Sequence, residues 1–400
     1  MSTAPVVELG RLVTIVGGGT PSKARPEFFV GDVPWVTPKD MKVWTVVDSE
    51  DHISPAAIDA SAAKLVPAGS VLVVIRSGVL KHTLPVAIAG RPVTLNQDMK
   101  ALICDERTEP RYLAFFLKNA EPKLLATVRG TTADNIPIDE LRALRIPLPP
   151  IGEQRRIAEI LEKAQAIRRK RKEAIALTND LLRSAFLEMF GDPMANTKGW
   201  PVKLLGELSD VSGGLQVTTA RAGNPIAMPY LRVANVYRDR LDLSEVKEIR
   251  VTEAERVRAT LQHGDVLVVE GHGNPAELGR AAVWRDEIAG CTHQNHLIRV
   301  RPNRTLMEPI FVSTCLNSSS GRQQMLSLGK TTSGLNTIST NNVRSVQIIV
   351  PPLQLQTAYA GIVERVRRLE SRMEQRNKED ATLFSALVAL AFGSSQEIPC

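Results

Sequence analysis

Short runs of β-branched and other apolar residues alternate with turns rich in glycine and proline in two parts of the chain, roughly residues 1–150 and 200–350. Runs of this length and composition favour buried strands, and the clearest are Val71–Ile75, Val266–Val269 and Val346–Val350. Short helices are predicted at Pro110–Lys118 and Asp139–Leu144. We therefore expect each part to be a mixed α/β globule that is large enough for its own core.

A different pattern follows each of two double prolines, Pro149-Pro150 and Pro351-Pro352. Proline cannot continue a strand ladder or lie inside a helix. Beyond each pair, a set of mainly apolar positions recurs at alternating steps of four and three residues, which indicates a heptad seam on a long helix. The first seam comprises Ile157, Leu161, Ala164, Arg168, Arg171, Ile175, Thr178, Leu182, Ala185 and Met189. The second comprises Ile362, Val366, Leu369, Met373, Arg376, Asp380, Leu383, Leu387 and Leu390.

Neither helix is stable alone with so narrow an apolar stripe, and the simplest partner for each is the other helix. A whole globular domain connects the two helices, so we expect them to pair antiparallel. This register places Ile157 near Leu390, Arg171 opposite Arg376, and Arg168 near Asp380 and Glu379.

The predicted fold class is α+β, with two similar mixed α/β domains joined by two long antiparallel coiled-coil helices in pseudo-two-fold symmetry. The expected boundaries are a first domain over residues 1–150, a central helix over 151–191, a second domain over 192–350, a C-terminal helix over 351–393 and a tail over 394–400.

The two halves of the chain repeat each other. Val33-Pro34-Trp35-Val36 matches Met228-Pro229-Tyr230-Leu231, and Gly69–Val74 matches Gly264–Val269. Asn96-Gln97-Asp98 aligns with His293-Gln294-Asn295. Because such matches keep the same order at a nearly constant offset, they indicate a duplication.

Composition and charge narrow the possible partners. The 400 residues carry a formal net charge of +7, which permits a polyanionic partner without proving one. With 4 Trp, 4 Tyr and 9 Phe, extensive stacking on unpaired bases is a poor first hypothesis. Cys104, Cys291, Cys315 and Cys400 form no Cys-x-x-Cys pair, which argues against zinc ribbons and thioredoxin-type motifs. No signal peptide or membrane-spanning run is apparent, so we expect a soluble cytoplasmic protein.

Motifs of catalytic or cofactor sites are incomplete. Gly329-Lys330-Thr331 lacks the upstream glycine of a P-loop, and Gly271–Ala276 does not open the long helix of a dinucleotide-binding turn. His293 and His296 lie near Cys291, but a metal site needs more ligands, so a structural or surface role is favoured. We expect neither a metal site nor a catalytic site.

Polar loops at the ends of predicted strands favour contact with DNA, because Arg, Lys, Asn and His read base edges and hold phosphates. The candidate DNA-binding residues of the first half are Lys39, Lys42, Arg76, Lys81, His82 and Thr131. Those of the second half are Arg232, Asn235, Tyr237, Arg238, His272, Asn274, Lys330 and Thr331. The basic run Arg168–Lys172 on the first helix is either a solvated face or a surface for an acidic partner or a phosphate backbone.

Three segments carry a resemblance to a known family: Gly17–Ser22, the run Pro149–Ile157 that contains Gly152-Glu153-Gln154, and Phe190-Gly191-Asp192-Pro193. In this order within a duplicated chain, they resemble the specificity subunit of type I restriction–modification systems over essentially the whole sequence. The second helix departs from the family pattern because Leu355 stands where the first has Glu153, although Gln356 is kept. This departure puts the local capping of that helix in question.

The resemblance implies a non-catalytic subunit in which each domain reads one part of a bipartite, non-palindromic DNA site and the helices set the spacing. It also implies two modification subunits, which methylate adenine with S-adenosylmethionine, and restriction subunits that use ATP and Mg. No cofactor is expected on this chain itself. Spacer and partner-docking residues would include Ile157, Leu161, Arg168, Arg171, Leu182, Ile362, Leu369, Arg376 and Leu387. An alternative is a coiled-coil interaction scaffold without DNA specificity, which salt-dependent DNA binding would separate from this reading.

Overall fold

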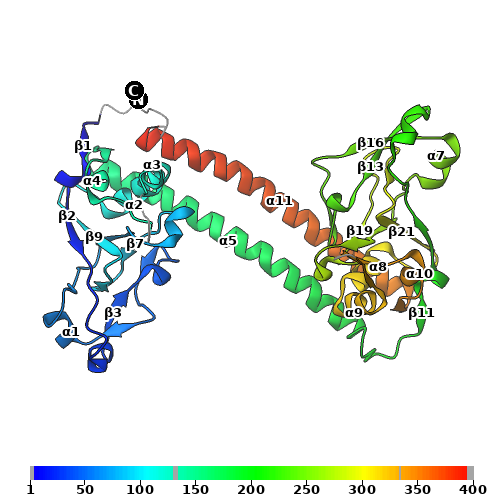
Figure 1. Cartoon of the computed structure of the whole chain (residues 1–400), viewed down its shortest axis with the longest axis horizontal. Coiled ribbons are helices and arrows are strands. Elements are labelled where there is room, and N and C mark those ends of the chain that lie inside the picture. The colour runs from blue at the N-terminus through cyan, green and yellow to red at the C-terminus, as the bar shows by residue number, and fades with distance from the viewer. Residues whose placement is uncertain (1–3, 129–133, 333–334, 394–400) are drawn as a thin grey trace. The chain divides into compact units, whose positions relative to one another are not determined.

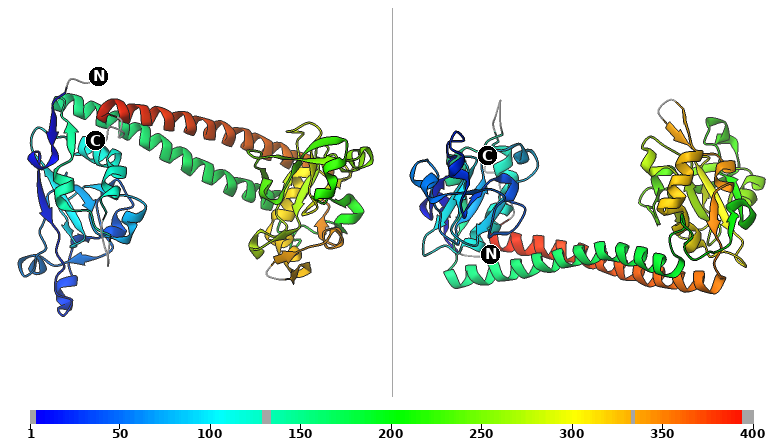
Figure 2. Two further views of the ribbon diagram at one scale, coloured as in Figure 1. Left: turned by 45° about the horizontal axis from the view of Figure 1, so that its top comes forward. Right: turned by 90° about the horizontal axis from the view of Figure 1, so that it is seen from below.

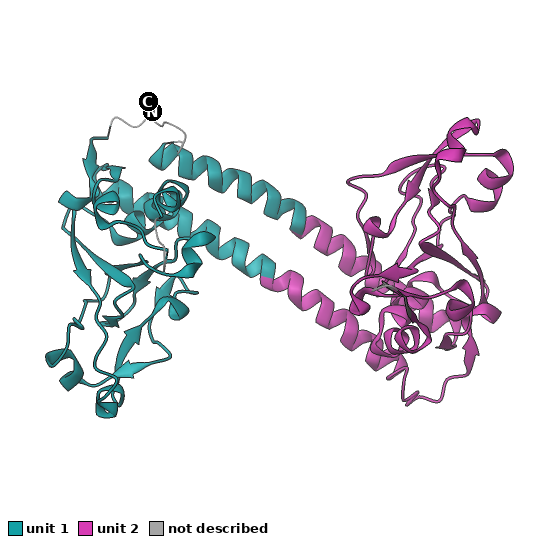
Figure 3. Cartoon of the chain, viewed as in Figure 1, with its two compact units in different colours: residues 1–172, 374–400 teal, residues 173–373 magenta. Residues whose placement is uncertain are grey.

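A computed structural model describes residues 4–128, 134–332 and 335–393. The chain divides into two compact units, residues 1–172 with 374–400 and residues 173–373, shown in separate colours in Figure 3. Two long helices, α5 (Ile151–Phe190) and α11 (Leu353–Phe392), each contribute one half to each unit and are unbroken in Figure 1. The units therefore divide both helices near their middle, whereas the sequence-based boundaries lie at the helix ends.

The first unit is built on a five-stranded sheet of order β2-β9-β6-β7-β4 and a three-stranded sheet of order β5-β3-β8. The strands are β2 (Val13–Gly17), β3 (Val33–Val36), β4 (Thr45–Val46), β5 (His52–Ile53), β6 (Val71–Val74), β7 (Val86–Ala89), β8 (Thr94–Leu95) and β9 (Met99–Cys104). A separate pair joins β1 (Val6–Glu8) to β10 (Arg145–Pro147). The short helices are α1 (Pro55–Asp59), α2 (Pro110–Asn119), α3 (Glu121–Ala126) and α4 (Ile138–Arg142).

The second unit has a four-stranded sheet of order β12-β21-β17-β19 and a three-stranded sheet of order β16-β13-β20. The strands are β12 (Ser209–Gly213), β13 (Ile226–Leu231), β16 (Lys247–Val251), β17 (Val266–Val269), β19 (Ala281–Val283), β20 (Thr292–His293) and β21 (Leu297–Pro302). Smaller ladders join β11 (Val202–Leu204) to β24 (Gln347–Ile349), β14 (Val236–Tyr237) to β15 (Arg240–Leu241), and β18 (Gly271–His272) through β23 (Leu335–Thr337) to β22 (Lys330–Thr332). The helices are α6 (Leu205–Leu208), α7 (Glu253–Ala259), α8 (Pro309–Asn317), α9 (Ser319–Leu328) and α10 (Thr340–Arg344).

The two units share one strand arrangement, as the sequence repeat predicts. The order β2-β9-β6-β7 recurs as β12-β21-β17-β19, and β5-β3-β8 recurs as β16-β13-β20 with the same antiparallel and parallel pairings. The parallel pair aligns Trp35 with Thr94 in the first unit and Tyr230 with Thr292 in the second. The duplication is therefore structural and extends to the register of the strands.

That register corrects one alignment made from sequence. Because Thr94 occupies the position of Thr292, the equivalent of His293 is Leu95, whereas the sequence comparison set Asn96 against it. Gly18 and Gly214 support the same shift: a Cβ on either would overlap the backbone carbonyl of Asn96 or Gln294, respectively. Glycine is required at this turn because the backbone of the neighbouring segment approaches so closely.

Each core encloses a central valine-rich strand and the end of one long helix. Val71–Val74 and Val266–Val269 are fully buried, in line with the strands expected there. The end of α11, which Figure 2 shows beside the first unit, places Phe392 against Tyr112 and Phe116. The end of α5 likewise packs Phe190 into the core of the second unit. The helix ends are therefore integral to the two cores.

A buried glutamine fixes the start of each long helix. Gln154 donates to the carbonyls of Arg107 and Pro149, both at 2.8 Å, and accepts from the backbone of Glu109 at 3.0 Å. Gln356 makes the matching contacts, with distances of 3.2 Å to Leu306, 2.8 Å to Pro351 and 2.9 Å to Glu308.

The residues before these glutamines contribute less. Glu153 forms only an exposed ion pair with Arg156 at 3.7 Å. Leu355, at the equivalent position, packs against the core of the second unit. The change from glutamate to leucine therefore leaves the helix start intact, which answers the capping question raised by the sequence.

The heptad seam is right in α5 and half wrong in α11. In α5 every expected position is at least partly buried except Arg168. In α11, Val366, Met373, Asp380 and Leu387 are on the seam, but Leu369, Arg376, Leu383 and Leu390 are exposed. In place of these exposed residues the seam uses the next residue of the helix, namely Glu370, Asn377, Phe384 and Ala391. Near the start of the helix, Val363 is likewise more buried than the expected Ile362. Of the residues that take these sites, Glu370 and Asn377 are polar, while Val363, Phe384 and Ala391 are apolar.

Interhelical contacts within each unit are antiparallel. In the first unit Arg171 forms an ion pair with Asp380, and the Arg168 guanidinium lies 5.5 Å from the centre of the Phe384 ring. In the second unit the Thr178 hydroxyl donates to Glu370. In the first unit Arg171 and Arg168 thus contact residues about one turn beyond the expected Arg376 and Asp380. In the second unit the contact of Thr178 with Glu370 lies within one residue of the expected register.

Candidate nucleic-acid interface

The candidate loops of the first unit differ in how far their cations are already paired. Lys39 contacts Glu50 at 3.2 Å and Asp51 at 2.9 Å, and the hydrogen bond to Asp51 is the main cause that raises the pKa of this ammonium group. Lys42, Lys81 and His82 are exposed. Arg76 is paired with Asp98 at 2.7 Å, with 47% of the arginine side chain exposed. Lys42, Lys81 and His82 are thus the more accessible candidates, and Thr131 lies outside the described residues.

In the second unit the first candidate loop is held by its own side chains. Asn235 is 3% exposed, and its amide donates to the carbonyls of Asp242 and Glu245 and accepts from the Arg232 backbone. Asp40 accepts from the Thr37 backbone at the equivalent turn of the first unit. Asn235 therefore supports the loop and is not exposed for base contact. Arg232 contacts the Glu245 carboxylate at 3.2 Å.

Tyr237 and its neighbours form a cation–aromatic cluster. The guanidinium groups of Arg240 and Arg280 lie 4.9 Å and 4.8 Å from the Tyr237 ring centre. Arg238 donates to Asn317 and to the carbonyl of Ala276, and its partial burial lowers the pKa of the guanidinium. Arg280 is 6% exposed and anchors Val233 through its backbone carbonyl. Of this cluster, Tyr237 and Arg240 are exposed, whereas Arg238 is partly buried and Arg280 is buried.

The ladder β18-β23-β22 brings together candidates that are far apart in sequence. His272 pairs with Asn336, and the neighbouring strand carries Lys330 and Thr331. The His272 ring accepts a hydrogen bond from the Asn274 backbone at 3.0 Å, and the Asn274 side chain caps the turn at Ala276. Lys330 is exposed. The ladder therefore brings the backbones of these candidate segments together.

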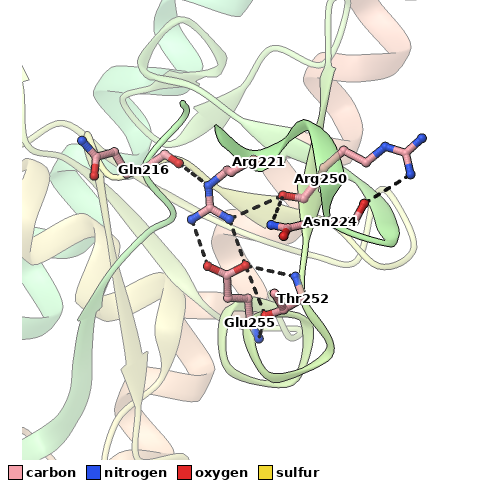
Figure 4. Close-up of polar contacts among 6 residues, drawn as sticks. All are labelled: Gln216, Arg221, Asn224, Arg250, Thr252 and Glu255. Atoms are coloured by element: carbon pink, nitrogen blue, oxygen red, sulfur yellow. Dashed lines mark hydrogen bonds and ion pairs between the residues drawn. The ribbon is translucent and has the colours of Figure 1, made fainter. Parts of the chain in front are cut away.

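The loop after the glycine pair of the second unit is clamped by an arginine that sequence reasoning did not single out (Figure 4). Arg221 binds both carboxylate oxygens of Glu255 at 2.9 Å and donates to the Gln216 carbonyl. This contact, followed by the backbone hydrogen bond from Thr252, lowers the pKa of Glu255 to about 2. Arg221 is thereby committed to the protein and shapes the loop over residues 216–224.

The histidines near Cys291 do not assemble into a metal site. His293 is 1% exposed and neither ring nitrogen has a partner in the structure, while His296 contacts Glu270 at 3.0 Å. Burial, and then the nearby Arg299, lowers the pKa of His293 to about 3. Among residues 4–128, 134–332 and 335–393, no group of three or more metal-binding side chains is gathered at one place.

The long helices leave a set of large apolar side chains exposed. Arg376 and Leu369, expected on the seam, are exposed, while Ile157, Leu161, Leu182, Ile362 and Leu387 are buried or partly buried. The exposed apolar residues are Ile160, Ile167, Leu177, Leu181, Leu187, Leu369, Leu383 and Leu390. Over the part of the chain that the structure describes, no helix is long and apolar enough to cross a membrane.

Comparison with known proteins supplies the family. A model described as the type I restriction modification DNA specificity domain matches residues 1–177. The type I restriction enzyme MjaIX specificity subunit of Methanocaldococcus jannaschii is 23% identical over 88% of this chain and 83% of that protein. The EcoR124I/EcoR124II specificity subunit of Escherichia coli is 42% identical over 39% of each chain. This chain is similar to the specificity subunits of type I restriction–modification systems.

Solved structures extend the likeness over the entire fold. The S subunit of the type I system of M. genitalium has a TM-score of 0.60 at 15% identity, covering 98% of this chain and 97% of that one. A chain from a study of complex assembly and conformational transition of the type I R-M system has a TM-score of 0.57 at 19% identity, with 98% and 100% covered. The predicted α+β fold is therefore confirmed. The relatives matched in sequence are named specificity subunits, which agrees with the expectation of a non-catalytic chain.

Proposed function

We propose that this chain is the DNA-reading subunit of a type I restriction–modification complex. Each unit reads one part of a bipartite site, and partner subunits carry out adenine methylation and cleavage. The observation that carries this proposal is the pairing of a shared strand frame with different loop chemistry in the two units. Arg76, Lys81 and His82 stand in the first unit, whereas His272, Asn274 and Lys330 stand in the second. Because the two units share one strand arrangement but carry different loop side chains, the two half-sites on the DNA should differ, and the full site should not be a palindrome.

The helices supply the second requirement of such a complex. Their exposed leucine and isoleucine side chains offer apolar surface for two modification subunits, which would bring S-adenosylmethionine. Restriction subunits would bring ATP and Mg. Lys170 and Lys172 are also exposed on α5, while Arg168 and Arg171 face α11. The basic run is thus partly structural, and its exposed lysines remain available to a phosphate or an acidic protein surface.

Domain replacement tests this function. Residues 1–150 would be exchanged for the equivalent domain of another specificity subunit, and the methylated motif would be determined by genome-wide methylation sequencing in cells that also contain the modification subunit. One half of the motif should change while the other half and the spacer persist. A change in both halves of the motif would contradict independent reading by the two units. If the unaltered chain shows no salt-dependent binding to DNA, the scaffold alternative is favoured.

A further inference from the structure

Each of the two units carries a contact between an acidic and a basic side chain at one equivalent place in the strand frame. In the first unit the backbone amides of Ile75 and Arg76 donate to the Asp98 carbonyl at 2.9 Å and 3.1 Å. In the second, the Glu270 amide donates to the His296 carbonyl at 3.0 Å. The frame thus makes Asp98 the counterpart of His296, and Ile75 the counterpart of Glu270.

A second set of backbone contacts fixes the same equivalence from the other side. The Ile136 amide donates to the Ile75 carbonyl at 2.8 Å, and the Ile338 amide donates to the Glu270 carbonyl at 2.8 Å. Because two independent strand neighbours agree, the correspondence does not depend on sequence alignment. The place is the point where β6 meets β9 in the first unit, and where β17 meets β21 in the second.

The acidic and basic residues occupy this place in opposite order along the chain: the basic Arg76 precedes Asp98 in the first unit, whereas the acidic Glu270 precedes His296 in the second. Arg76 follows the first strand and contacts Asp98 at 2.7 Å, while Glu270 follows the matching strand and contacts His296 at 3.0 Å. Thus the acidic group precedes β9 in one unit and follows β17 in the other. The carboxylates are 23% and 29% exposed, and their partners 47% and 53%. All four side chains can therefore reach solvent or a ligand.

The stability of the fold does not explain why these side-chain pairs are present. Half-exposed ion pairs contribute little to folding because water already solvates both charges. The strand junction is held by the backbone hydrogen bonds described above. What the pairs do provide is a carboxylate that is already oriented, and on Asp98 the side-chain amides of Asn96 and Gln97 add hydrogen bonds at 3.1 Å and 3.5 Å. Such preorganisation reduces the cost of binding.

The neighbouring residues contact further polar segments of each unit. Gln97, beside Asp98, accepts a hydrogen bond from the Thr20 hydroxyl at the loop after the glycine turn. Gly271, beside Glu270, begins β18, whose neighbour β23 pairs with the strand that carries Lys330. The carboxylates thus lie next to loops from several segments of each unit.

We propose that Asp98 and Glu270 are specificity-determining residues, each accepting a hydrogen bond from the exocyclic amino group of a base in its own half-site. Carboxylates accept from cytosine N4, while arginine donates to guanine. Arg76 and His296 orient the carboxylates before DNA binds and contact the adjoining base or phosphate afterwards. This inference rests on the proposed function and assigns its base-reading groups, which the sequence comparison missed because it misaligned this segment by one residue.

The test uses the full-length chain and selection from a pool of randomised duplexes. Asp98→Asn and Glu270→Gln keep the shape of each side chain but replace a carboxylate oxygen by a donor. Each variant should lose about 5–150-fold discrimination at one base position, in the half-site of its own unit only. Asp139→Asn, which removes the exposed 3.2 Å ion pair with Arg142, is the matched control and should leave the motif unchanged.

Folding is followed by circular dichroism melting, and Arg76→Gln provides a second variant that retains the Asp98 carboxylate. Its preferred base at the Asp98 position should persist with weaker selection. An unchanged motif in folded Asp98→Asn and Glu270→Gln variants would overturn the inference, as would an equal loss of affinity for every sequence. If the unaltered chain selects no motif, the proposed function itself fails and this inference with it.

Discussion

His293 shows how one buried side chain distinguishes otherwise equivalent units. It is fully enclosed on β20 with both ring nitrogens lacking partners, and its counterpart in the first unit is the buried Leu95. Replacing a buried polar group that has no partner with an apolar one removes a desolvation cost. We expect His293→Leu to raise the free energy of unfolding by about 1–3 kcal/mol at pH 7, measured by urea denaturation.

The same residue gives a pH dependence with a defined sign. The pKa of His293 is lowered to about 3 in the folded chain, so between pH 6.5 and 3 the unfolded state binds the extra proton. Acidification through this range therefore destabilises the native protein, and His293→Leu should reduce this part of the acid sensitivity. An identical pH profile of the melting temperature in both proteins would contradict this. Leu95→His should have the opposite effect and increase the acid sensitivity of the native protein.

At the scale of the elements, adjacent residues of α11 separate the two readings of its seam. Phe384 packs on Phe115 with ring centres 6.4 Å apart and beneath Arg168, whereas Leu383 is 58% exposed. Phe384→Ala should lower the free energy of unfolding by about 2 kcal/mol, less than for a fully buried phenylalanine. Leu383→Ala should change it by less than about 0.5 kcal/mol. Urea denaturation followed by helix ellipticity measures both, and equal losses would restore the seam expected from sequence.

At the scale of the whole molecule, α5 and α11 pass from one unit into the other as continuous helices, so their length can set the spacing between half-sites. A seven-residue insertion preserves the heptad seam. Inserted both between Lys172 and Glu173 and between Asn377 and Lys378, it keeps Arg171 facing Asp380 and Thr178 facing Glu370. The helices lengthen by about 10.5 Å, and at about 3.4 Å per base pair the unread spacer should grow by about three base pairs.

Methylation sequencing reads this result directly, with both half-sites expected to stay as they are. Insertion of four residues into α5 alone is the control, because it rotates one seam away from the other and should destabilise the chain. An unchanged spacer in a folded and assembled heptad variant would contradict the role of the helices in spacing.

Sequence alone determined the features that depend on local chemistry and periodicity. Valine-rich runs form the central strands, the double prolines precede both long helices, and Gly18 and Gly214 mark the same close turn. The duplication was visible because each half needs the same strands to close its core. The α5 seam was also readable, since every heptad position expected there is buried or partly buried except Arg168.

Tertiary structure decided which of several suitable residues meets which. On α11, leucines stand on both sides of the true seam, and only the contacts of Glu370 and Asp380 with α5 select the buried side. Asn235 has the chemistry of a base reader, yet it is buried, its amide nitrogen donates to two backbone carbonyls and its oxygen accepts from the Arg232 backbone. The equivalence of Asp98 with His296 rests on backbone pairing between segments distant in sequence, which no local pattern encodes.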